Sequence, residues 1–291
     1  MDHLDFVGLT TLMEITRGQS SVTVGVIDGP AALDHRDLAG QRIREVPAGA
    51  AFGCARTKSP ACVHGTFVLG MLAAKRGSVA SAICPDCTFV LRPIFSETAT
   101  ADDPIPRASP ADLAAAILDV VDAGAHVVNL SLSLTQTSTM DERRLEEALN
   151  HAARRGVITV VAAGNGGAVG SSALTRHPWV VPVVACDRSG QPVARSDLGA
   201  SIGRRGLSAP GQNIVGLGSE GDPLTVSGTS AAAPFVTGAV ALLWSEFPRA
   251  SCGEVKLAVT QNSTGRRAGL VPPPLNAWWA YQRMAALRAT A

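Results

Sequence analysis

The chain has 291 residues, of which 46% are hydrophobic, and its 25 Lys and Arg residues almost balance its 24 Asp and Glu residues. A near-neutral chain lacks the basic surface that binds polyanions, so we expect no nucleic-acid partner. No segment approaches the roughly 18 consecutive apolar residues of a membrane span, and residues 1–19 are too polar for a secretory signal. We therefore expect a cytoplasmic protein without a membrane partner, folded as one domain over residues 1–291.

Short β-branched runs alternate with longer helical segments along the chain. We predict buried strands over 21–28, 88–95, 125–132, 156–164 and 179–187, and helices over 64–76, 109–124, 140–156 and onward from Ser230. Ser109-Pro110 is a typical helix start, and Gly124 and Gly156 are typical helix ends. This alternation predicts an α/β fold, a doubly wound and mainly parallel sheet flanked by helices.

Four polar residues stand where the ligands of such sheets bind, beyond the carboxyl ends of the strands. Asp28 ends the first predicted strand, Asn165 follows the fourth, and His64 and Ser230 each open a helix. Taken singly, each is more often a turn residue, a cap or an ordinary surface residue. Together they supply what acyl transfer by serine requires: a nucleophile, an imidazole base, an acid that orients the base, and a donor to the oxyanion.

The sequences around these residues are VGVIDGP, CVHGTF, VVAAGNGG and SGTSAAAP, in that order. This order resembles the subtilisin-like serine proteases from about Val22 to the C-terminal segment. The resemblance implies that Asp28 is the acid, His64 the base and Ser230 the nucleophile, and that Asn165 is the side-chain donor of the oxyanion hole. It implies a serine endopeptidase that hydrolyses peptide bonds without a cofactor.

The resemblance also places the substrate. An extended peptide would lie beside residues 131–133, and the side chain before the scissile bond would enter a pocket between that segment and residues 162–164. Backbone pairing gives affinity, whereas the pocket gives selectivity. Ser133 stands where the family usually has glycine and would crowd the pocket mouth, and the small residues Ser172 and Ala173 would form an uncharged base. The substrate-binding residues are thus predicted to be Ser131, Leu132, Ser133, Ala162, Ala163 and Gly164.

Small residues surround the predicted nucleophile. Gly228 would let the backbone approach the substrate carbonyl, and the alanines at 231–233 would let the helix pack tightly below the site. The backbone N–H of Ser230 would join Asn165 in holding the oxyanion, because helix N-termini favour negative charge. Pro234 is expected in the first turn of the helix, where a missing N–H is tolerated.

The six cysteines leave several interpretations open. Cys84 and Cys87 form a C-P-D-C pair, but without a second C-x-x-C the zinc signal is weak, and a redox pair lacks thioredoxin-like surroundings. We favour structural cysteines, bridged or free. A bridge between Cys54 and Cys62 would hold the approach to His64, although a reducing cytoplasm argues against it.

We expect no metal. Secreted relatives in this family hold calcium in a loop after the helix that carries the base, with an aspartate reaching in from upstream. Asp37 stands at the matching upstream position. Residues 73–85, however, contain no Asn or Asp and place Lys75 and Arg76 where a hard cation would need oxygen ligands.

Two departures from the usual family motifs narrow the resemblance. The acid is followed by Gly29-Pro30, and Phe67 ends the H-G-T motif. Together with the segment ICPDCTFVLRPIFSE, these motifs make the chain most similar to the proteases that mature ribosomal peptides in cyanobactin-type pathways. One branch of these enzymes removes the leader, and another closes a macrocycle with the help of an added helical element between acid and base. Because only 36 positions separate Asp28 from His64, we expect hydrolysis.

We therefore expect a monomer whose partner is a peptide or precursor-protein substrate. Residues 96–110 would form a stiff, acidic rim, with Glu97, Asp102 and Asp103 among three prolines, that rejects most peptides. Two alternatives stay open: a degradative subtilisin of broad specificity, and a pseudoprotease that only binds peptides.

Overall fold

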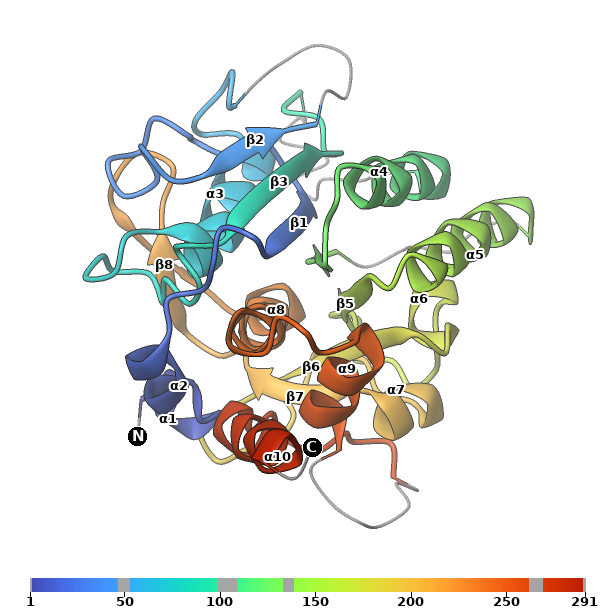
Figure 1. Cartoon of the computed structure of the whole chain (residues 1–291). Coiled ribbons are helices and arrows are strands. Elements are labelled where there is room, and N and C mark those ends of the chain that lie inside the picture. The colour runs from blue at the N-terminus through green and yellow to red at the C-terminus, as the bar shows by residue number, and fades with distance from the viewer. Residues whose placement is uncertain (1, 47–52, 99–108, 133–138, 262–268, 290–291) are drawn as a thin grey trace.

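The computed structural model describes residues 2–46, 53–98, 109–132, 139–261 and 269–289 (Figure 1). Its centre is a seven-stranded parallel sheet with the strand order β2-β3-β1-β4-β5-β6-β7. The strands are β1 (Thr23–Asp28), β2 (Ile43–Glu45), β3 (Thr88–Pro93), β4 (Val127–Leu130), β5 (Ile158–Ala162), β6 (Val180–Cys186) and β7 (Leu207–Pro210). An antiparallel hairpin of β8 (Ile214–Leu217) and β9 (Pro223–Val226) lies outside this sheet.

Helices cover both faces of the sheet, as a parallel sheet requires. One face carries α3 (Pro60–Ala73) and α8 (Thr229–Glu246), and the other carries α4 (Pro110–Asp122) and α5 (Thr139–Arg154). The remaining helices are α1 (His3–Phe6), α2 (Leu9–Ile15), α6 (Ala173–Arg176), α7 (Ala200–Arg205), α9 (Cys252–Thr260) and α10 (Ala277–Ala289). None of the helices in the described part of the chain is long and apolar enough to cross a membrane.

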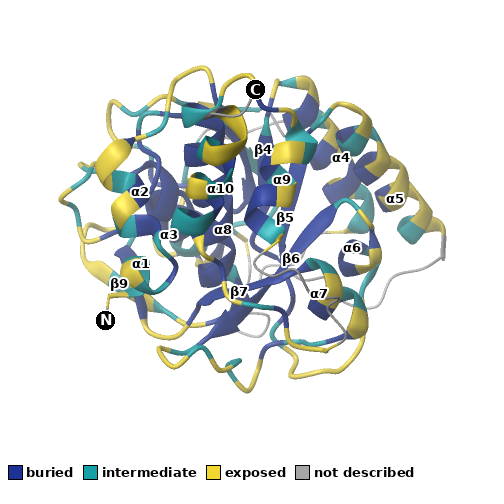
Figure 2. Ribbon diagram, turned by 60° about the horizontal axis from the view of Figure 1, so that its bottom comes forward, coloured by how far each residue is buried: buried dark blue, intermediate teal, exposed yellow. Residues whose placement is uncertain are grey.

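Strand residues alternate between the two hydrophobic layers. Val24 and Val26 of β1 pack into the layer with α3 and α8, whereas Ile27 packs into the layer with α4 and α5. Figure 2 shows the central strands β4, β5, β6 and β7 buried and the exposed residues on the outward faces of the helices. Because both faces are buried, the strands read as continuous apolar runs, which is the pattern that predicted them.

The predicted α/β architecture is confirmed, and each of the five predicted strands forms with slightly shorter ends. Ser109 caps α4 by accepting a hydrogen bond from the backbone N–H of Asp112 at 3.0 Å. Gly124 and Gly156 take positive φ angles of 87° and 74° just beyond α4 and α5. Strands β2, β7, β8 and β9 are not among the predicted strands; of these, β2 and β9 lack the buried apolar run that identifies the predicted strands.

The helix expected to open at His64 begins four residues earlier, at Pro60. The reason is local: the Ser59 side chain accepts a hydrogen bond from the N–H of Cys62, and Pro60 occupies the first helical position. Ser59-Pro60 is the same signal as Ser109-Pro110. His64 therefore lies in the second turn of α3, where its side chain can face the end of β1.

Candidate active site

The predicted acid and base are in direct contact. Asp28 ends β1 and is fully buried, and its Oδ1 lies 2.6 Å from Nδ1 of His64, whose side chain is 26% exposed. An ionised carboxylate only accepts hydrogen bonds, so Nδ1 carries the proton and Nε2 keeps a free lone pair. The N–H of Gly29 donates to the same carboxylate oxygen at 2.7 Å. This geometry leaves His64 able to accept a proton at Nε2.

Two glycines make this contact possible. A Cβ on Gly29 would lie 2.0 Å from the carbonyl oxygen of Ala61, and one on Gly65 would lie 2.4 Å from the carbonyl oxygen of Pro30. The chain after β1 and the first turns of α3 therefore pack backbone against backbone. The Gly that follows Asp28 and the Gly that follows His64 are thus required by this close packing.

The electrostatics of His64 favour its charged form. Burial lowers the pKa of His64, but the charge of Asp28 and the hydrogen bond between the two side chains outweigh burial. The net result is a pKa raised above the ordinary value of 6.5.

Ser230 is the second residue of α8, where the backbone N–H has no acceptor within the helix. Asn165 lies against this helix end: its Oδ1 accepts hydrogen bonds from the N–H of Thr229 at 2.9 Å and from its hydroxyl at 3.1 Å. With Oδ1 engaged, Nδ2 is the group of Asn165 that can donate to a ligand. The Asn165 amide and the N-terminus of α8 are therefore held together as one unit.

Gly228 is required at the start of α8 for two reasons. Its φ angle is 137°, and a Cβ would lie 3.1 Å from Oδ1 of Asn165. Any side chain would press on the Asn165 amide. The structure thus shows a close approach of Gly228 to the Asn165 side chain, and the expected approach to a substrate carbonyl stays a prediction.

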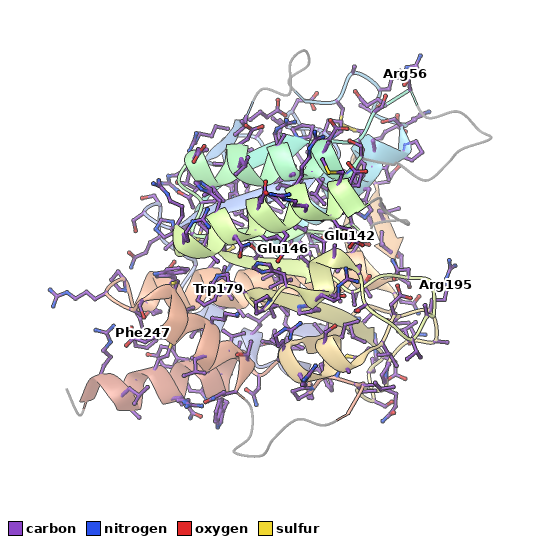
Figure 3. The ribbon with its side chains drawn as sticks, turned by 90° about the vertical axis from the view of Figure 1, so that its right-hand side faces the viewer. Arg56, Glu142, Glu146, Trp179, Arg195 and Phe247 are labelled. Atoms are coloured by element: carbon purple, nitrogen blue, oxygen red, sulfur yellow. A yellow bond between two sulfur atoms is a disulfide. The ribbon has the colours of Figure 1, made fainter. Side chains whose placement is uncertain are left out.

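Asp197 is a residue that the sequence patterns did not single out. Its Oδ1 accepts hydrogen bonds from the N–H groups of Gly166 at 2.9 Å and Ala168 at 2.8 Å. A Cβ on Gly164, which has φ of 123°, would lie 2.0 Å from Oδ2 of Asp197. Asp197 thus fixes the loop on both sides of Asn165. Arg195, two residues before Asp197, lies at the periphery of the molecule (Figure 3). Nothing in the local sequence signals the role of the Asp197 carboxylate.

The predicted substrate segments follow neighbouring strands. Ser131 and Leu132 come directly after β4 and are buried, and Ala162, Ala163 and Gly164 end or follow β5. Ser133 lies outside the described residues. Ser172, expected at the pocket base, caps α6 by accepting a hydrogen bond from the N–H of Thr175 at 3.2 Å. The two segments lie side by side beyond the carboxyl ends of two central strands, because β4 pairs with β5.

A disulfide closes the loop that precedes His64. Cys54 and Cys62 are bonded with their Cα atoms 5.6 Å apart, so the predicted bridge is confirmed as geometrically possible. Figure 3 shows Arg56, which lies within this loop, at the periphery. The β8–β9 turn also contacts this loop, because the hydroxyl of Ser219 donates to the carbonyl of Thr57 at 2.6 Å.

Glu97, expected as part of an acidic rim, is engaged by the same loop. Its carboxylate accepts hydrogen bonds from the N–H groups of Ala55 at 2.8 Å and Arg56 at 2.9 Å, and from the hydroxyl of Ser59 at 3.1 Å. It supports the loop and is not a free charge. Asp102 and Asp103 of the proposed rim lie outside the described residues.

Potential metal ligands have other roles in the described part of the chain. Cys54, Cys62 and Glu97 cluster within 4.8 Å of one another, but the two sulfurs are bonded to each other. Cys84 and Cys87 are free and buried. Burial raises the pKa of Cys84, whereas the hydrogen bond with Cys84 lowers the pKa of Cys87, so the two thiols differ in how readily they form a thiolate.

Cationic side chains occupy the segment that would correspond to a calcium loop. The Arg76 guanidinium donates to the carbonyls of Met13, Thr16 and Ile83, and the Lys75 ammonium donates to the carbonyl of Arg36 at 2.6 Å. These carbonyls therefore interact with charges that the chain supplies itself. The absence of a metal stays a prediction.

Known proteins of similar sequence are peptidases. Residues 19–273 match the subtilase family. A thermostable alkaline protease of Halalkalibacterium halodurans is 30% identical over 202 residues, which are 69% of this chain and 52% of that protein, so the chain spans about half of its length. Subtilisin DY of Bacillus licheniformis is 27% identical over 251 residues, 84% of each chain.

Solved structures show the same fold. The prenylagaramide maturation protease PagA superposes with a TM-score of 0.82 at 27% identity, covering 95% of this chain and 98% of its own. A mutant of the protease domain of PatA superposes with a TM-score of 0.80 at 29% identity, covering 92% and 97%. Given the parallel sheet, the Asp28–His64 pair at the carboxyl end of β1 and this match over most of the sequence, the chain belongs to the subtilase family of peptidases.

Proposed function

We propose that this protein is a serine endopeptidase in which Ser230 is the nucleophile, His64 the general base and Asp28 the acid that orients His64. The observation that carries the proposal is the 2.6 Å hydrogen bond between Asp28 Oδ1 and His64 Nδ1. Membership of the subtilase family supports the proposal, and so does the position of Ser230 at the N-terminus of α8, where backbone N–H groups have no acceptor within the helix.

The groups around the site suit each step of peptide hydrolysis. His64 Nε2 takes the proton of Ser230 Oγ as the oxygen bonds to the substrate carbonyl carbon, and Asp28 stabilises the imidazolium that forms. The N–H of Ser230 and Nδ2 of Asn165 donate to the oxyanion. His64 then gives the proton to the leaving amine. In the second half of the reaction a water molecule, deprotonated by His64, attacks the acyl carbon, and the proton returns to Ser230 Oγ as the acyl group leaves.

We propose a peptide precursor as the substrate, hydrolysed by a monomer whose domain spans residues 1–291. The maturation proteases PagA and PatA are similar in structure at 27% and 29% identity, and the substrate segments after β4 and β5 suit an extended peptide. No helix occurs between Asp28 and Ser59 in the described residues 29–46 and 53–59, which favours hydrolysis over ring closure. Because ribosomal precursors are made in the cytoplasm, the proposal places the enzyme there, whereas the Cys54–Cys62 bridge favours an oxidising compartment.

Contacts between the chain ends support one domain. The N–H of Ala277 at the start of α10 donates to the carbonyl of Val7 at 2.8 Å, and α10 packs against α2 and α9. The first and last helices therefore belong to the same packed body.

Active-site labelling tests the proposal. A fluorophosphonate probe is expected to label Ser230, and Ser230→Ala or His64→Ala to abolish labelling and lower kcat on the order of 10⁶-fold, as for the corresponding subtilisin residues. Ser227→Ala, at an exposed serine close by, is the matched control and is expected to keep both activities. Labelling of a different serine, or hydrolysis that survives Ser230→Ala, would refute the assignment.

A further inference from the structure

Pro234 leaves one backbone carbonyl of α8 without its helical partner. The sequence placed this proline in the first turn, but it is the sixth residue of α8 and lies in the helix interior. In an α-helix the carbonyl of residue i accepts from the N–H of residue i+4. Proline has no N–H, so the carbonyl that loses its donor is that of Ser230.

A side chain from the sheet replaces the missing donor. The hydroxyl of Ser131 donates to the carbonyl oxygen of Ser230 at 3.0 Å. Ser131 follows β4 and is only 3% exposed. Its side chain is therefore directed at the backbone of the nucleophile, while its own backbone belongs to the predicted substrate segment.

Two further buried groups determine the direction of this hydrogen bond. The Asn129 amide Nδ2 donates to the Ser131 hydroxyl at 2.8 Å, and the Thr237 hydroxyl donates to Asn129 Oδ1 at 2.8 Å. Because the Ser131 oxygen already accepts one proton, its own proton points to Ser230. Asn129 and Thr237 are fully buried, so no solvent competes and the bonds polarise one another. The chain of bonds begins and ends on α8.

We propose that Ser131, together with Asn129 and Thr237, is a positioning residue that holds Ser230 in its catalytic place. The inference rests on the proposed function of Ser230 as nucleophile. Without the Ser131 hydroxyl, the Ser230 carbonyl would lose the donor that replaces its helical partner, and the first turn of α8 would shift to find another donor. Such a shift moves both Ser230 Oγ and the Ser230 N–H, and a displacement of about 1 Å can cost on the order of 100-fold in rate.

The proline also explains why the donor comes from outside the helix. A helical N–H at position 234 would hold the Ser230 carbonyl independently of the sheet. With Pro234, the carbonyl is held by the residue whose backbone would border the substrate. This hydrogen bond therefore fixes the position of the nucleophile relative to the substrate segment.

A double-mutant cycle tests this role. Ser131→Ala is expected to slow acylation of Ser230 by a fluorophosphonate roughly 10- to 100-fold. Pro234→Ala restores an N–H that can donate to the Ser230 carbonyl, so in that background Ser131→Ala is expected to slow acylation less than about threefold. The probe is small and does not pair with residues 131–133, so the rate reports the position of Ser230 rather than peptide binding.

Further variants separate positioning from packing. Ser131→Thr keeps a hydroxyl and is expected to recover most of the rate, and Thr237→Val removes the far end of the relay and is expected to slow acylation in the same direction. Ser245→Ala is the matched control, since Ser245 is a buried serine of α8 that donates to Ala241 at 2.8 Å. It is expected to leave the acylation rate unchanged.

Each outcome bears on one proposal. An equal cost of Ser131→Ala in the unmodified chain and in the Pro234→Ala background would overturn the positioning role. Absence of labelling in the unmodified chain would instead overturn the proposed function of Ser230, and with it the role of Ser131 in positioning a nucleophile. The Tm values of the unmodified chain, Ser131→Ala, Pro234→Ala and the double variant would then still report the contact, because Ser131→Ala should lower Tm less in the Pro234→Ala background.

Discussion

At the scale of single residues, the Asp28 carboxylate is buried and only partly satisfied. Its Oδ1 accepts from Gly29 and His64, while Oδ2 has no hydrogen-bond partner among the described residues. A buried carboxylate is stabilised by a nearby positive charge. The imidazolium of His64 supplies that charge when it receives a proton, so the site favours the charged intermediate of the proposed reaction.

The raised pKa of His64 predicts the pH dependence of activity. The base must be neutral, so kcat/KM is expected to fall as the pH drops through an apparent pKa above 6.5. Asp28→Asn removes the charge that raises the pKa and leaves the burial that lowers it. This variant is therefore expected to move the acid limb to lower pH and to reduce kcat about 10⁴-fold through the wrong tautomer.

Initial rates across a pH series would measure both effects. Asp122→Asn is the control, because Asp122 pairs with His151 at 3.3 Å on the surface and not at the site. An acid limb that stays in place in Asp28→Asn would contradict the assigned cause.

At the scale of elements, the loop before α3 connects parts that are distant in sequence. The Cys54–Cys62 bridge closes it over eight residues, Glu97 after β3 binds its N–H groups, and the β8–β9 turn binds the carbonyl of Thr57. This loop leads directly into the helix that carries His64. Its covalent closure therefore limits how far the start of α3 can move.

Removing the bridge is expected to destabilise the fold. For a loop of this length, replacing both cysteines by serine should lower the free energy of unfolding by about 2–3 kcal/mol. Urea unfolding would measure the change, with Cys252→Ser, at a partly exposed free cysteine, as the control. Six reactive thiols after unfolding without reductant, or an unchanged midpoint, would show that the bridge does not stabilise the protein. The same thiol count in protein trapped inside cells would test the proposed compartment.

At the scale of the whole molecule, the described substrate segments, residues 131–132 after β4 and 162–164 at the end of β5, carry mostly small side chains. Glu97 is engaged within the protein, so it contributes less to charge selection than the sequence indicated. Selection would then depend on the shape of the segments after β4 and β5. Simultaneous fit at several positions is what separates a processing enzyme from a degradative one.

A peptide library analysed by mass spectrometry would measure this selectivity. We expect cleavage within a narrow motif spanning several positions, with casein left largely intact, because turnover would require a match at several subsites at once. Ser230→Ala, tested in parallel, controls for contaminating proteases. Rapid cleavage after many unrelated residues would favour the degradative alternative.

The sequence by itself determined five of the seven strands of the central sheet, the helix cap at Ser109 and the residue types around the Asp28–His64 pair. These features depend on local periodicity, on cap chemistry and on glycines adjacent to the reacting side chains. Such signals are contained within a few neighbouring residues.

Only the tertiary structure decided how distant residues support the site. The Asp197 carboxylate binds N–H groups 29 and 31 residues away, and Ser131 binds a carbonyl 99 residues away. The need for Ser131 became visible only when Pro234 was placed in the interior of α8. A hydrogen bond between residues far apart in the chain leaves no periodic pattern, because its geometry depends on how the strands and helices pack.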